Sequence, residues 1–280
     1  MMNKNECFSK LRMLILMNFF IILLLSSLKG FTQIKLTIDS LKLSPPGTVW
    51  VKDNIYIDQF PVTNADYTEF LLTVSAYYNP KIHDTIQKIK PYNVNWKKLS
   101  EYFFSIEPDD EYMKKLEQEY YSPLSWTSDS SLQFSYYDDE YYSNYPIINI
   151  SYEQAKEYCK WRTDMVLLSY AINVGNKKKR DVFYTKFAYR LPKFDDWKSA
   201  YDLFEIENEP FTKPVSGEDS ESEYFHYSHG NVSEMLDEKG KAVGLSWKDM
   251  LDVPKLINPI QYQKPSDWLG FRCVCEILEY

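Results

Sequence analysis

Cysteine and histidine are the scarce residues of this sequence that could carry chemistry. The chain of 280 residues has four cysteines and three histidines. Cys273 and Cys275 are two positions apart, so on a strand they point to the same face and are poorly placed to bond each other. Cys159 with Cys273 is therefore the better disulfide pair, and three buried thiols are the alternative. Such a bond forms in an oxidising compartment.

The remaining candidate groups form no complete catalytic pattern. His226 and His229 are three residues apart beside a glycine, so they would hold a metal if that turn were helical. Two exposed loop histidines are the alternative. Cys275 is a candidate nucleophile, but no histidine can be assigned to it as a base. The sequence has no G-x-S-x-G elbow, no P-loop and no H-E-x-x-H motif.

Local patterns predict the elements that must position these groups. Residues 48–57 predict a strand or a hairpin that turns at Asp53 and Asn54. Capping boxes, in which a hydroxyl side chain and a polar side chain three residues later satisfy each other's backbone amide, predict helices starting at Thr63 and Ser151. Further predicted elements are strands at 34–43, 145–150 and 269–277, and helices at 109–121 and 194–201.

The composition predicts a folded, aromatic-rich protein of one domain, or of one domain with an insertion. There are 32 Lys and Arg against 40 Asp and Glu, which gives a formal net charge of -8. A generic nucleic-acid binder is excluded, because it needs a basic surface to neutralise phosphates. Aromatic residues make up 17 % of the chain, which is too many for a disordered segment.

The N-terminus has the layout of a secretory signal peptide over residues 1–33. Lys4, Lys10 and Arg12 form a positive region before the apolar run 13–25, and small polar residues follow. The run is too short for a typical membrane span, although a retained anchor is the alternative. We therefore expect export to the bacterial periplasm or the cell exterior, with no stable membrane insertion after cleavage.

Residues 78–144 carry many aromatic and charged side chains and few regular patterns. Their run 136–142 (YYDDEYY) is either an acidic, aromatic binding rim or an amphipathic surface segment whose tyrosine rings pack against the protein. Residues 101–145 are the candidate binding surface.

Seven short motifs occur in one order along the chain and together resemble the formylglycine-generating-enzyme family, also called the sulfatase-modifying-factor domain. These motifs are 46–48 (PGT), 60–67 (FPVTNADY), 145–161 (YPIINISYEQAKEYCKW), 189–197 (YRLPKFDDW), 230–235 (GNVSEM), 244–247 (GLSW) and 270–274 (GFRCV). The stretch 78–144 matches no part of the family pattern.

The resemblance implies an α+β fold that is irregular, loop-rich and related to C-type-lectin-like domains. It divides the chain into the signal peptide at 1–33 and one domain at 34–280, with an insertion at about 78–144. It also implies the disulfide between Cys159 and Cys273.

The resemblance further implies a calcium site at the turn that contains Gly230, Val232 and Glu234. Calcium takes six to eight oxygen ligands. The family's further asparagine ligand corresponds to Tyr227 here, so one ligand is lost. The alternative is that Glu234 caps a tight turn without an ion.

Formylglycine generation itself is not expected. The family oxidises a substrate cysteine with copper held by two thiolates, which are soft ligands that favour copper(I). Those cysteines lie between the motifs at 244–247 and 270–274, and here the interval 248–269 contains none. Another branch of the superfamily binds iron through three histidines in an extra helical domain, and this chain has no matching spacing.

The sequence therefore predicts an exported, non-catalytic member of the family. It would act as a binding or scaffold protein at the bacterial envelope, with an envelope protein or a glycan as partner and no nucleic acid. Exposed aromatic residues contribute strongly to such interfaces. The alternative is a metal-dependent oxidase or hydroxylase of changed chemistry that acts on a peptide or a small molecule.

Overall fold

The computed structural model describes a domain built on two four-stranded sheets. The described residues are 42–77, 124–129, 135–173, 182–184, 186–204, 230–249 and 258–279. The chain divides into a unit of residues 1–42, of which only Lys42 is described, and a unit of residues 43–280.

The first sheet has the strand order β1-β2-β8-β3, and all its neighbours are antiparallel. The strands are β1 (Thr48–Lys52), β2 (Ile55–Asp58), β3 (Lys186–Arg190) and β8 (Val274–Glu279). The predicted hairpin at 48–57 is confirmed, and Asp53 takes a positive φ of 42° in its turn. The C-terminal part of the last predicted strand lies in β8, between β2 and β3.

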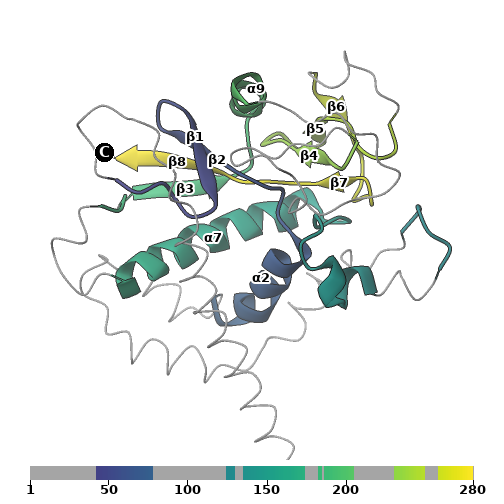
Figure 1. Cartoon of the computed structure of the whole chain (residues 1–280), viewed down its shortest axis with the longest axis horizontal. Helices are drawn as coiled ribbons and strands as arrows, with labels where there is room; N and C mark the ends of the chain where they lie inside the picture. The colour runs from purple at the N-terminus through teal and green to yellow at the C-terminus, as the bar shows by residue number, and fades with distance from the viewer. Residues whose placement is uncertain are drawn as a thin grey trace, which may run out of the picture. The chain divides into compact units, whose positions relative to one another are not determined.

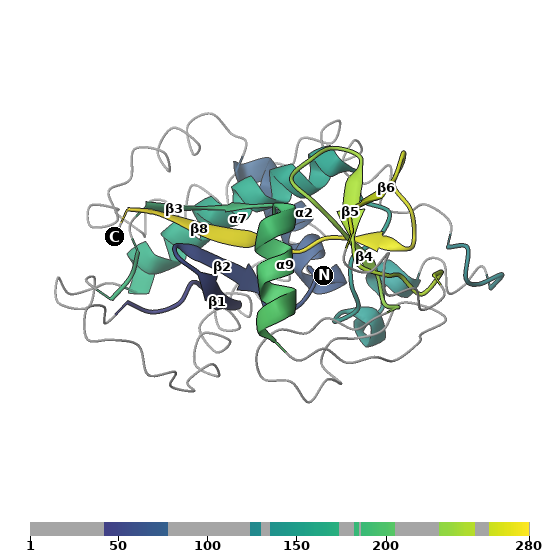
Figure 2. The same cartoon turned by 90° about the horizontal axis from the view of Figure 1, so that it is seen from above.

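Helices cover both faces of the first sheet. Helix α7 (Tyr152–Asn173) lies along one face and also contacts α2 (Asn64–Tyr77), while α9 (Phe194–Leu203) packs on the other face (Figures 1 and 2). A short 3-10 helix, η1, spans Glu140–Tyr142. Successive side chains of a strand point to opposite faces of its sheet, so the first sheet contributes to a hydrophobic core on each face. Cys273 and Cys275 belong to the core on the α7 side, and Val274 between them belongs to the core on the α9 side.

The second sheet has the order β6-β5-β4-β7. Its strands are β4 (Ser233–Met235), β5 (Lys241–Val243), β6 (Ile260–Gln261) and β7 (Leu269–Gly270), and the β4–β7 pair is parallel. At Gly270 a Cβ atom would lie 3.0 Å from the carbonyl oxygen of Ile147, so the close approach there requires glycine.

The helix starts follow the predicted capping boxes. The Thr63 amide donates to Asp66 Oδ2 at 3.0 Å, and the Asp66 amide donates back to Thr63 Oγ1 at 3.2 Å. The same reciprocal pair joins Ser151 and Gln154 at 2.7 and 3.2 Å. These bonds satisfy amides that a helix start leaves without partners. The prediction of α9 at 194–201 is also confirmed, with two further residues.

Two predicted strands differ from the structure. Residues 269–277 are divided between β7 and β8, because Phe271, Arg272 and Cys273 cross from the second sheet to the first. Residues 145–150 form no strand, only one bridge between Pro146 and Thr63, and Asn149 has a φ of 59° that interrupts an extended chain. Two further predictions lie outside the described residues. One is the helix at 109–121. The other is the strand at 34–43, of which only Lys42 and Leu43 are described, and these two form no strand.

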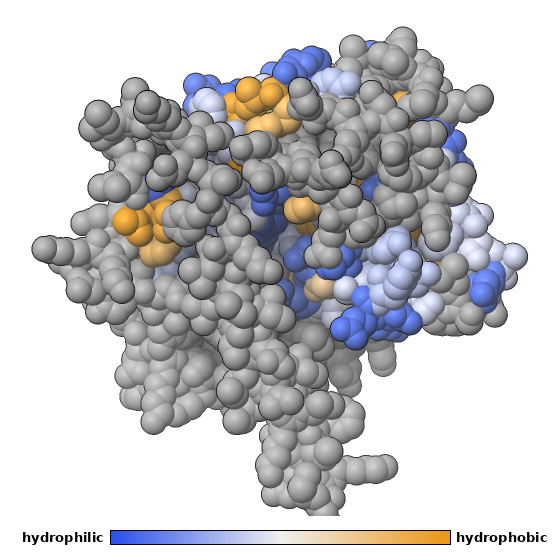
Figure 3. Space-filling view, viewed as in Figure 1, coloured by the Kyte–Doolittle hydropathy of each residue, from blue (hydrophilic) through white to orange (hydrophobic). Residues whose placement is uncertain are grey.

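Large hydrophobic side chains are exposed singly in the described part of the domain. They are Leu43, Trp50, Tyr141, Leu203 and Leu278. On the face drawn in Figure 3, the residues coloured as hydrophobic form a few small areas. Scattered apolar residues of this kind are usual on a protein surface.

Candidate functional site

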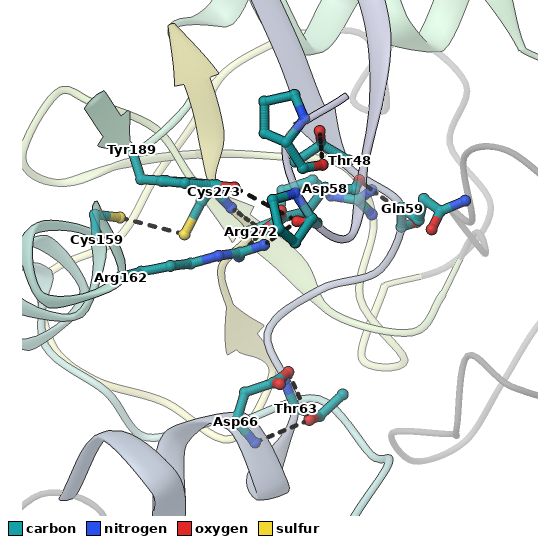
Figure 4. A network of polar contacts seen from close by, with 12 residues as sticks. Thr48, Asp58, Gln59, Thr63, Asp66, Cys159, Arg162, Tyr189, Arg272 and Cys273 are labelled. Atoms are coloured by element: carbon teal, nitrogen blue, oxygen red, sulfur yellow. Dashed lines mark hydrogen bonds and ion pairs between the residues drawn. The ribbon is translucent and has the colours of Figure 1, made fainter. Parts of the chain in front are cut away.

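The predicted cysteine pair lies in the core between α7 and the first sheet. The Sγ atoms of Cys159 and Cys273 are 3.4 Å apart, and both residues are buried free thiols in the structure (Figure 4). Burial raises the pKa of the Cys273 thiol well above its ordinary value, and the nearby Cys159 adds to the rise. The two cysteines are thus close neighbours, and the disulfide bond itself stays a prediction.

A buried ion pair lies beside the cysteines. Asp58 ends β2, and its Oδ2 accepts from Arg162 Nη1 at 2.7 Å and from the backbone amide of Cys273 at 2.8 Å. Arg162 also lies over the ring of Tyr189 at 4.4 Å and donates to the carbonyl oxygen of Pro46 at 3.2 Å. A single guanidinium therefore connects α7 with β2, with β3 and with the turn that precedes β1.

The Asp58 carboxylate is only partly satisfied. It is 3 % exposed, and among the described residues no group donates to its Oδ1. Burial raises the pKa of Asp58, and the opposing effect of Arg162 does not cancel that rise. The turn before β1 contributes to the enclosure, since Gly47 has a φ of 71° and approaches the Arg162 guanidinium closely.

A second buried ion pair holds the predicted calcium ligand Glu234. Arg272 Nε donates to Glu234 Oε2 at 2.6 Å, and Arg272 Nη2 donates to Glu234 Oε1 at 2.5 Å. The indole of Trp197 donates to Oε2 at 3.0 Å. Gly230 forms the preceding turn with a φ of 86°, and Val232 is buried. Both oxygens of the carboxylate thus accept bonds from the protein.

The described part of the candidate surface 101–145 is divided between core and solvent. Tyr136 and Tyr137 are buried, at 0 % and 3 % exposure, whereas Tyr141 is 70 % exposed. The side chain of Asn64 fixes the segment by donating to the carbonyl oxygens of Tyr136 and Tyr142 at 2.8 and 3.0 Å. A rigid support therefore presents one acidic and aromatic edge to solvent, formed by Asp138, Asp139, Glu140 and Tyr141, which we call the 138–141 edge.

Sequence comparison assigns the family. Residues 28–277 match the sulfatase-modifying factor enzyme 1-like domain. The chain belongs to this family. Among curated proteins none matches the sequence. The solved structure described as "Crystal Structure of CarF" is 19 % identical, with a TM-score of 0.30, over 50 % of this chain and 70 % of CarF. The family assignment and the α+β, loop-rich architecture agree with the resemblance drawn from the motifs.

The donors of a family copper site do not fit this chain. The interval 248–269 contains no cysteine. Trp247 lies just before this interval, and its indole donates to the carbonyl oxygen of Asp267 within the interval at 3.1 Å. Asp267 in turn accepts from the backbone amide of Ser125. No cluster of three histidine, cysteine, aspartate or glutamate side chains gathers in the described ranges.

The third cysteine is as deeply enclosed as the other two. Cys275 is on β8, fully buried, and burial raises the pKa of its thiol. Reactive cysteines have depressed thiol pKa values and some exposure, so Cys275 has the features of a structural thiol. His83, His226 and His229 lie outside the described residues, so their roles stay predictions.

The arginine partners were not among the residues that the sequence singled out. A signal for them was present. Arg162 is three positions after Cys159 on a helix, so both face the same core. Arg272 lies between two residues of the apolar motif 270–274, where a charged side chain needs an internal partner.

No helix in the described residues has the length and hydropathy to span a membrane.

Proposed function

We propose that this chain is an exported, non-catalytic member of the sulfatase-modifying factor enzyme 1-like family that acts as a binding or scaffold protein at the bacterial envelope. The observation that carries the proposal is the state of its cysteines. The interval 248–269 has none, and Cys159, Cys273 and Cys275 are all buried in the core. A copper(I) site needs accessible thiolates, and side chains enclosed in the core do not supply them.

The bonding of residues in the family motifs supports a retained scaffold. Asn64 and Arg272 both lie in such motifs, and both are buried and hydrogen-bonded to distant segments of the domain. These contacts preserve shape without any thiolate chemistry. The 138–141 edge supplies a surface for a partner, since Tyr141 offers a large ring and its acidic neighbours add charge.

Metal binding and turnover test the non-catalytic part. The purified protein without residues 1–33 is titrated with copper(I) under anaerobic conditions, and a peptide that contains a cysteine is then incubated with it. We expect no stoichiometric copper and no oxidation of the peptide. One copper per chain that is lost in Cys275→Ser would overturn the proposal and favour an oxidase of changed chemistry.

Site-specific photo-crosslinking tests the binding part. A photoreactive phenylalanine replaces Tyr141 in one variant and Leu278 in a control, because the two are 70 % and 61 % exposed. In intact cells we expect a discrete crosslinked species from position 141 and none from position 278. Equal labelling at both positions, or none at either, removes the 138–141 edge from the proposal.

The N-terminus of the protein recovered from the envelope fraction tests export. Residues 1–33 have the signal-peptide pattern, so N-terminal sequencing should begin close to residue 34. A chain that begins at Met1 in the cytoplasmic fraction would contradict the location. That result would leave the fold assignment unchanged.

A further inference from the structure

Three tyrosine rings lie against one another at the end of η1, and we call them the tyrosine triad. The ring centroids of Tyr141 and Tyr142 are 4.9 Å apart, and those of Tyr142 and Tyr145 are 5.0 Å apart. The rings of Tyr141 and Tyr145 are 6.1 Å apart. Tyr141 is 70 % exposed, whereas the other two are partly buried and pack against the core. One exposed ring is therefore supported by two further rings.

The core and the local backbone hold the triad in place. The ring of the buried Tyr136 lies 5.5 Å from that of Tyr142 and 6.2 Å from that of Tyr145. The Tyr141 amide donates to Asp139 Oδ1 at 2.8 Å, and the Tyr145 amide donates to the carbonyl oxygen of Tyr142 at 3.0 Å. A surface held in this way loses little conformational freedom when a partner covers it, which favours binding.

Negative charge surrounds the triad and comes from two segments of the chain. The described segments 124–129 and 135–145 contain no lysine or arginine. They contain four exposed acidic residues, which are Asp129, Asp138, Asp139 and Glu140. Burial raises the pKa of Tyr142, and the neighbouring Tyr141, Asp139 and Asp129 add to the rise. Acidic residues from both segments therefore place negative charge near the same ring.

An exposed aromatic ring beside carboxylates favours a cationic ligand. The face of the ring attracts a positive charge, and neighbouring carboxylates add to that attraction. An arginine side chain fits better than a lysine, because a planar guanidinium can stack on a ring and also donate to a carboxylate. A neutral sugar could stack on the ring but would gain nothing from the four charges, and an anionic lipid or glycan would be repelled.

We infer that the tyrosine triad is a docking site for an arginine side chain in an exposed basic segment of a partner protein. The inference rests on the proposed function, since it names the class of partner that the 138–141 edge would bind. The two can fail separately. A crosslink from position 141 to a partner without a basic segment would leave the binding role standing and would overturn only the arginine site.

Titration with a pair of labelled peptides tests the need for a positive charge. The purified protein is titrated against fluorescein-labelled hexa-arginine and against hexa-citrulline, whose urea groups have the shape of a guanidinium without its charge. Fluorescence anisotropy is read at low and at high salt. We expect the arginine peptide to bind and to weaken with salt, and the citrulline peptide not to bind. Equal binding of the two peptides, or binding of neither, would overturn the inference.

Matched variants test whether the arginine peptide binds at the triad. Tyr141→Leu keeps an exposed apolar side chain without the ring, so we expect binding about threefold weaker. Glu140→Gln removes one exposed charge and should weaken binding about twofold.

Two controls make the same changes at the hairpin of β1 and β2. Trp50→Leu removes an exposed ring, and Asp53→Asn removes an exposed charge at a turn whose positive φ asparagine tolerates. Both should bind the arginine peptide as the wild type does. Unchanged binding in Tyr141→Leu, or equal weakening in the variants and their controls, would show that the peptide responds only to the overall charge and would overturn the site.

Discussion

Two arginine–carboxylate pairs in the described part of this domain, Arg272–Glu234 and Arg162–Asp58, differ in how completely the carboxylate is satisfied. Glu234 shares both oxygens with Arg272 and also accepts from Trp197. Asp58 bonds Arg162 through Oδ2, while no described group donates to its Oδ1. Asp58 has its pKa raised by burial. An opposite charge therefore stabilises a buried carboxylate only to the extent that its lone pairs are also satisfied.

The comparison extends to a third acidic residue. Glu69 on α2 has a buried Oε1 that no described residue bonds, and burial together with the charge of Asp66 raises its pKa to about 9. Arg162 opposes this rise but does not bond Glu69 directly. The three carboxyl groups thus form a series: both oxygens of Glu234 accept bonds, Asp58 is bonded through Oδ2, and Oε1 of Glu69 has no partner among the described residues.

The largest expected effect comes from breaking the complete pair. Glu234→Gln leaves the Arg272 guanidinium buried without a counter-charge, so we expect a loss of about 3–5 kcal/mol in the free energy of unfolding. Urea unfolding followed by tryptophan fluorescence measures it. A loss no larger than that of Asp58→Asn would mean that the completeness of the pair does not govern its contribution.

The cysteines beside Asp58 give the next largest effect. If the predicted disulfide forms in the oxidised protein, Cys159→Ser should lower the free energy of unfolding by about 2–4 kcal/mol, because the bond closes a loop of more than a hundred residues. Cys275→Ser is the matched control, since Cys275 is equally buried but has no cysteine partner in the prediction. Equal losses in the two variants, or no thiol protection in the wild type, would show that no bond forms.

A smaller loss is expected from the half-satisfied pair. Asp58→Asn keeps an oxygen to accept from Arg162 and the Cys273 amide, and it removes a charge whose burial is costly, so we expect about 1–2 kcal/mol. The same urea measurement reports it. Asp58→Ala removes the acceptor as well and should cost more. An equal cost for both substitutions would assign the effect to charge alone.

The Glu69 carboxyl gives an effect of the opposite sign. The folded pKa of Glu69 is raised, so the folded chain holds the proton more tightly and the free energy of unfolding falls as pH rises from about 4.5 toward about 9. Glu69→Gln mimics the protonated form, so it should reduce this slope and raise the free energy of unfolding above that of the wild type at pH 8. Urea midpoints from pH 5 to pH 9 measure it. Parallel profiles for both proteins would contradict the raised pKa.

Much of the local structure was predictable from short stretches of sequence. Three kinds of local feature depend on residues only a few positions apart: the hairpin of β1 and β2, the capping boxes at Thr63 and Ser151, and the start of α9. Each can be read from a short stretch of sequence, because both interacting residues lie within it. The division of 269–277 between two sheets was not predictable. It depends on pairing with distant strands, since β7 pairs with β4 and β8 pairs with β2 and β3.

The sequence alone determined the family of this protein, the order of its motifs and the loss of the copper cysteines, because these are properties of residue identity and spacing. Only the tertiary structure decided which charged groups are buried together. Asp58 meets Arg162 across 104 positions, and Glu234 meets Arg272 across 38. Such pairs depend on where distant segments cross and on how much water is excluded there, and no local pattern encodes either quantity.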